Sequence, residues 1–393
     1  MKRGAKTLGF GAIGGVIIAI GLGWERSKPV DSPVPQPVPM LDKRGAGVAN
    51  WVDRGLLRLA EVEVEEGSDE QLALDAGAAS AAGVIDVGES RSEPLESLMT
   101  ERDELYRALS FELGVPEAKL KEIRAIVEGS PFLGQGNPAV TRHPMTKQQC
   151  RARRAQAALA SDDERICGAT NMVALFDPGQ GEAASAKLCI DQFEFPNIAC
   201  EYPVVWVRAS EAARLCRLLD KRLCDAHEWE GACAGKLRSP AKEYESWVPR
   251  MQAELFHNQG REPVWAPGFH PTGRTCATGA QKSPGCVDAS WEHCGTNTYP
   301  AGAFPRCVSP FGVYDLHGNV AEHMSLPLNE AQLGARGGVG ETEMKGSWFA
   351  FDEYHPHPDD CRWRAPAWHA TAVDMETSHF NYHLGFRCCR DLE

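Results

Sequence analysis

The sequence predicts an α+β fold for the C-terminal half of the chain, from about residue 188 onward. Helical patterning becomes sparse there, and eight of the ten tryptophans lie between Trp206 and Trp368. All fourteen cysteines lie at or after Cys150. Long loops with little regular secondary structure usually need covalent cross-links or bound ions to hold them in place. An even number of cysteines can supply such cross-links as disulfides.

Composition limits the classes of function. The chain has 393 residues, which is long enough for several segments and a sizeable core. Its 41 basic and 54 acidic residues give a net charge of −13. Because phosphate backbones require a basic surface, this balance argues against a nucleic-acid partner.

The N-terminus predicts a membrane anchor over residues 1–28. Lys2, Arg3 and Lys6 precede an uncharged run over residues 7–24. This run exceeds the apolar core of about 7–15 residues in a cleaved signal peptide, so we favour an uncleaved anchor. A cleaved signal remains the alternative. In both cases the basic flank stays in the cytoplasm, and the rest of the chain is periplasmic or extracellular.

Three further segments follow the anchor. Residues 29–93 are Pro-rich and then acidic, which predicts a disordered linker. Residues 94–149 contain a helical hairpin over about 94–129, with leucines at helical spacing, a stop at Gly114 and a second start at Pro116. The Cys-rich domain spans 150–393, and its clearest helices are expected from Ser210 and from Asp225, each acting as an N-cap.

Several segments of this domain resemble the sulfatase-modifying-factor family, or formylglycine-generating enzyme family. The resemblance covers about residues 188–391 and implies an α+β, C-type-lectin-like fold with little regular secondary structure. In order, the segments are Cys189–Asn197, Tyr202–Val207, Ala209–Cys216, Lys221–Glu230, Phe311–Glu322, Lys345–Trp348 and His383–Cys388.

The resemblance implies a structural calcium site in the loop Asp315-Leu-His-Gly-Asn-Val-Ala-Glu322. Its ligands would be the side chains of Asp315 and Glu322 and the carbonyl oxygens of Gly318 and Val320. Calcium takes six to eight hard oxygen ligands, including backbone carbonyls, so these residues suit it. The competing interpretation is that Asp315 caps a turn and Glu322 pairs with an arginine.

The family's oxidase chemistry needs a pair of thiolates for copper, placed after the element Gly346-Ser-Trp348. The first thiol position falls on Ala350 and the second near Asp360, beside Cys361. Cys361 is therefore the one candidate catalytic residue, and copper or iron is not expected. Residues His355 and His357, followed by Asp359 and Asp360, form a second, weaker candidate for a transition metal.

The resemblance also implies disulfides. Cys216 would pair with Cys388 and Cys233 with Cys361, which leaves Cys224 and Cys389 as candidates for each other. Four central cysteines can pair in three ways, or could bind zinc, and they are Cys276, Cys286, Cys294 and Cys307.

These observations favour a membrane-anchored, extracytoplasmic domain that binds an unknown protein or small-molecule ligand and lacks copper-dependent formylglycine formation. The alternative is a divergent metal-dependent oxidoreductase of the formylglycine-generating or non-haem-iron type, acting on thiols. The sequence leaves open whether the protein is an enzyme.

Overall fold

The computed structural model describes residues 97–155, 163–238, 254–255, 257–259, 262–287, 289–327, 340–352, 358–365 and 370–392. The predicted anchor 1–28 and linker 29–93 lie outside the described residues. No helix in the described ranges is long and apolar enough to cross a bilayer.

The predicted helical hairpin is present as α1, Leu98–Leu113, and α2, Glu117–Gly129. Ser97 caps α1 by accepting a hydrogen bond from the Thr100 N–H, and Gly114 ends it in the left-handed conformation, with φ of 64°. A residue with a Cβ is disfavoured there, which explains why glycine stops the run.

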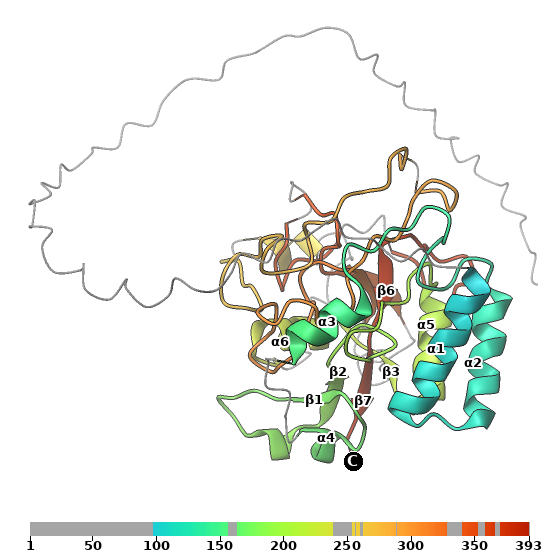
Figure 1. The fold of residues 1–393 in the computed structure, drawn as a ribbon. Helices are drawn as coiled ribbons and strands as arrows, with labels where there is room; N and C mark the ends of the chain where they lie inside the picture. Colours follow the sequence, from blue (N-terminus) through green and yellow to red (C-terminus); the bar gives the residue numbers. More distant parts are fainter. Residues whose placement is uncertain are drawn as a thin grey trace, which may run out of the picture. The chain divides into compact units, whose positions relative to one another are not determined.

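The hairpin lies beside α5, Ala209–Leu218 (Figure 1). The three helices share a core that also contains Phe386. Leu109 of α1 and Ile123 of α2 are both fully buried in it. The hairpin is therefore part of the folded domain and does not form a separate appendage.

The first sheet has the order β1-β2-β7-β3, with every neighbouring pair antiparallel. The second has the order β5-β4-β6, in which β4 runs antiparallel to β5 and parallel to β6. All residues of β1, β2 and β4 are buried, so these strands lack the alternating pattern that would reveal a half-exposed strand. The strands are Met172–Leu175 (β1), Leu188–Asp191 (β2), Arg222–Leu223 (β3), Ala321–Leu326 (β4), Glu341–Lys345 (β5), Leu384–Phe386 (β6) and Cys388–Asp391 (β7).

The helix expected from Asp225 is α6, Ala226–Ala234, with Asp225 as its N-cap; the Asp225 N–H donates to the Glu228 carboxylate. Our N-cap for α5 was wrong. The cap is Arg208, whose N–H donates to Glu211 three residues later, so Ser210 lies inside the first turn. The remaining helices are α3, Lys147–Arg154; α4, Asp163–Cys167; and the short 3-10 helix η1, Ala183–Ser185.

Seven disulfides include every cysteine of the chain. Three of them are the pairs that the resemblance implies: Cys216–Cys388, Cys224–Cys389 and Cys233–Cys361. The central cysteines are joined to one another, so they are not arranged as zinc ligands. The other four bonds are Cys150–Cys200, Cys167–Cys189, Cys276–Cys307 and Cys286–Cys294.

Candidate functional site

The acidic loop between Asp315 and Glu322 is a tight turn in the interior. Asp315, Gly318 and Asn319 all have positive φ, and both acidic side chains are buried. One Asp315 oxygen accepts a hydrogen bond from the Gly302 N–H at 2.5 Å, and the other has no partner. Burial raises the pKa of Asp315 to about 6.

Both carboxylate oxygens of Glu322 are hydrogen-bonded to one arginine. They accept hydrogen bonds from Nε and Nη2 of Arg387, each at 2.7 Å. The Trp229 indole N–H adds a contact of 3.2 Å. Arg387 lies between β6 and β7, the last strands of the two sheets, so this ion pair joins the sheets at their junction.

A third buried carboxylate, Glu194, lies in the same cluster and was not singled out from the sequence. It accepts hydrogen bonds from the Val320 N–H at 3.0 Å and the Asn319 amide at 2.6 Å. Burial and the neighbouring carboxylates of Asp315 and Glu322 raise its pKa well above the usual range. The sequence did contain a signal for this residue, because Glu194 lies in Cys189–Asn197, one of the segments that carry the family resemblance.

These residues fit a calcium ion in part. The unpartnered Asp315 oxygen and the excess of buried carboxylates favour a cation. Glu322 could act as a ligand only if Arg387 moved, because both of its oxygens already accept hydrogen bonds. The arginine pairing that the sequence left as the competing interpretation of Glu322 is therefore present.

Ala350 is one of the partly buried residues that pack against an aromatic cluster. Trp206 is almost fully buried at its centre, and Phe132, Trp291 and Phe380 pack around it, each half-buried. Ring centroids of Phe132 lie 5.0 Å from Trp291 and 5.9 Å from both Trp206 and Phe380. The Trp206 indole N–H is buried and has no hydrogen-bond acceptor.

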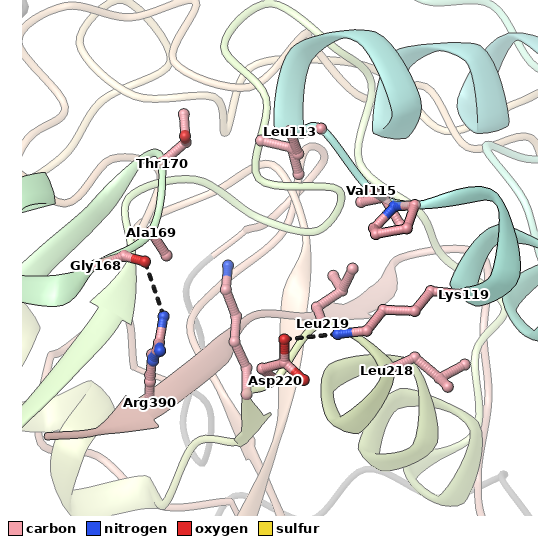
Figure 2. Close-up of a pocket in the computed structure, with 13 residues that line it drawn as sticks. Leu113, Val115, Lys119, Gly168, Ala169, Thr170, Leu218, Leu219, Asp220 and Arg390 are labelled. Carbon is pink, nitrogen blue, oxygen red and sulfur yellow. Dashed lines mark hydrogen bonds and ion pairs between the residues drawn. The ribbon is translucent and has the colours of Figure 1, made fainter. Parts of the chain in front are cut away.

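A separate pocket of about 340 Å³ lies between the turn of the hairpin, the end of α5 and β7 (Figure 2). Its cations already have partners. Lys119 pairs with Asp220 at 2.6 Å, and Lys221 with Asp191 at 2.5 Å. Arg390 donates to the Gly168 carbonyl at 3.0 Å. Carboxylates therefore neutralise two of the three cations of the pocket, whereas the Gly168 carbonyl is neutral and leaves the charge of Arg390 uncompensated.

A comparison with known protein families shows to which family the chain belongs. The sulfatase-modifying factor enzyme 1-like domain matches residues 168–392, which is more than half of the chain. The chain belongs to this family. No curated protein matches the chain. Among solved structures, the crystal structure of CarF is similar, with 13% identity and a TM-score of 0.32 over 56% of this chain and 97% of that chain. The assignment rests on the domain match.

Within this family domain, the positions expected for the copper thiolates do not fit copper. Ala350 carries a methyl group, and the Cys361 sulfur is bonded to Cys233. No cysteine of the chain is free. Cys361 is thus a cross-link in this structure, and it could act as a thiol only after reduction of this bond.

The histidine-rich segment is only partly described. His355 and His357 lie outside the described residues. Asp359 contacts His317, with Asp359 Oδ1 and His317 Nδ1 2.7 Å apart. Asp360 accepts hydrogen bonds from the N–H groups of Val264 and Arg362. The structure therefore places both aspartates in contacts with other segments.

Proposed function

We propose that this family member is a membrane-anchored, extracytoplasmic binding module without copper-dependent formylglycine formation. The observation that carries the proposal is the aromatic cluster at Ala350, where the family's oxidase chemistry calls for a thiol. Half-buried aromatic side chains offer apolar contact area to a ligand.

Phe132 gives this cluster a feature of its own. It lies before residue 168, outside the matched family domain, yet it packs on Trp206, Trp291 and Phe380. The adjacent chain is fixed by paired backbone hydrogen bonds between Gly134 and Val205, of 3.3 and 2.8 Å. These contacts support the proposal that the segment after the hairpin contributes to a binding surface near Ala350. The bound ligand is accordingly a small molecule or peptide that presents apolar or aromatic groups.

Ligand binding can be tested with the exported domain. Tryptophan fluorescence should respond to ligands from panels of oligosaccharides and short peptides, since Trp206 and Trp291 lie in the cluster. Trp291→Ala and Phe380→Ala should weaken binding about tenfold or more, as expected for aromatic anchors. Phe111→Ala, at a side chain that is 92% exposed on α1, is the matched control. Equal affinity in all variants would place the binding surface elsewhere.

The oxidase activity is tested directly. Copper-loaded protein should leave a cysteine-containing substrate peptide unchanged, whereas a family member with both thiols should convert it. Formylglycine product from this chain, or stoichiometric copper or iron together with a reactive Cys361, would instead support the oxidoreductase alternative. Calcium alone with no free thiol would support the binding module.

The proposal includes a calcium ion held by Asp315, with the Gly318 and Val320 carbonyls as further ligands. Glu322 would join them only after release from Arg387. The proposal also includes export and anchoring through residues 7–24. Seven disulfides support an oxidising compartment. Resistance of the full chain to carbonate extraction from membranes tests the anchor, and a mature N-terminus beyond Trp24 would show cleavage.

A further inference from the structure

His317 lies against a disulfide in the interior. Its Nε2 atom is 3.5 Å from the Cys233 sulfur and 3.7 Å from the Cys361 sulfur. All three residues are fully buried, and the three atoms lie within 4.8 Å of one another. Two sulfurs and one imidazole nitrogen therefore converge on one point.

The orientation of this imidazole is fixed from the opposite side. Nδ1 of His317 lies 2.7 Å from the Asp359 carboxylate, which accepts a hydrogen bond from Nδ1–H. Nε2 then carries the lone pair, and it accepts the Ala266 N–H at 3.0 Å, a neutral hydrogen bond that a metal would replace. A carboxylate that holds the far nitrogen of a histidine in this tautomer is the usual support of a metal-binding imidazole.

We propose that reduction of the Cys233–Cys361 disulfide creates a zinc site formed by the two thiolates and Nε2 of His317. A dithiol reductant breaks the S–S bond, supplies two electrons and two protons, and becomes a disulfide itself. Zinc then displaces the two thiol protons to water. Two thiolates and an imidazole with a further open position make a known type of zinc coordination.

The redox state of the two cysteines decides whether zinc can bind, because neither sulfur is a thiolate while the disulfide is intact. In that state the bond ties the end of α6 to the loop at 358–365. Zinc bound to both thiolates and His317 would keep the same elements together after reduction. The protein would then retain this connection in both oxidised and reduced conditions.

A second disulfide provides an internal control. Cys224–Cys389 also has a potential ligand nearby, the Glu228 carboxylate. However, Arg222 donates to both Glu228 oxygens, at 2.8 and 2.7 Å. Freeing a Glu228 oxygen would break a buried ion pair, whereas freeing Nε2 of His317 costs only the neutral hydrogen bond from Ala266. Reduction of Cys224–Cys389 should therefore not create a comparable zinc site.

The test uses wild-type protein treated with graded dithiol reductant, then zinc, then a thiol-alkylating reagent. Mass spectrometry should show one zinc per chain and protection of Cys233 and Cys361, but no zinc-dependent protection of Cys224 and Cys389. Reduced protein that binds no zinc, or zinc that protects both pairs equally, would overturn the proposal. This measurement needs no variant to fold.

Variants then test the role of the imidazole. Cobalt in place of zinc should give thiolate-to-metal charge-transfer absorption in the reduced wild type and in Cys224→Ser/Cys389→Ser, and none in Cys233→Ser/Cys361→Ser. Asp359→Ala should weaken zinc binding about 10–100-fold, and His317→Ala should weaken it at least as much. Unchanged zinc affinity in His317→Ala would show that the histidine is not a ligand.

Discussion

Arg387 and Glu322 form a two-point ion pair in the interior, with both N–O distances at 2.7 Å. Both side chains are essentially inaccessible to solvent. Arg387 also donates to the backbone carbonyls of Asp191 and Tyr314, at 3.1 and 3.0 Å. One guanidinium thereby connects the ends of both sheets with the acidic loop.

Removing this arginine should destabilise the domain strongly. Arg387→Met leaves the Glu322 carboxylate buried without its partner, which typically costs about 3–5 kcal/mol of unfolding free energy. Urea unfolding measures the loss. Lys119→Met breaks the exposed pair with Asp220 and should cost less than about 1 kcal/mol. Similar values for the two variants would contradict a stabilising role for the buried pair.

Calcium should stabilise the domain through Asp315. At a concentration of 100 times the dissociation constant, binding adds about 2.7 kcal/mol to the unfolding free energy. Thermal unfolding with calcium and with a chelator measures the shift, which should disappear in Asp315→Asn. Asp220→Asn, at an exposed acid elsewhere, is the control. A calcium shift that persists in Asp315→Asn would show that the ion binds at another place.

The hairpin should contribute to the stability of the whole family domain. Leu109 is fully buried in the core that α1 shares with α5 and Phe386, so Leu109→Ala should cost about 2–5 kcal/mol. On the same helix Phe111 is 92% exposed, and Phe111→Ala should change stability by less than about 0.5 kcal/mol. If the hairpin unfolded alone, tryptophan fluorescence of the domain would remain native in Leu109→Ala.

His143 should make the protein sensitive to acid. It is buried, stacks on Tyr202 with ring centroids 3.6 Å apart, and its Nδ1 lies 2.9 Å from the Thr298 carbonyl oxygen. Burial lowers its pKa to about 3. The unfolded chain then binds more protons, so this contribution is complete above pH ~6.5 and is lost as the pH falls toward 3.

The matching variant is His143→Phe, which keeps an aromatic ring on Tyr202 but cannot take up a proton. It should lose a pH-independent amount of about 1–3 kcal/mol, because the Thr298 carbonyl loses its donor. Urea unfolding between pH 4 and 7 should show a shallower pH dependence for the variant than for the wild type. Parallel pH profiles would contradict the role of His143.

Local signals in the sequence determined the fold class, the hairpin and the family. Leucine spacing, Gly114, Pro116 and the cap at Asp225 act within a few residues, so they can be recognised in the sequence. The fully buried strands could not be recognised in this way, because they do not alternate. The N-cap of α5 was missed because it is Arg208, which is not a typical capping residue. Its backbone N–H donates a hydrogen bond to the Glu211 carboxylate.

The cysteines from residue 150 onward predicted a cross-linked domain by themselves, and the missing thiol at Ala350 was also visible in the sequence. Only the tertiary structure placed Phe132 beside Trp206 and His317 beside the Cys233–Cys361 bond. Those partners are separated by tens of residues, and the contacts arise because packing and long-range disulfides bring distant loops together. Composition and spacing specify which groups are present, whereas their convergence depends on the folded chain.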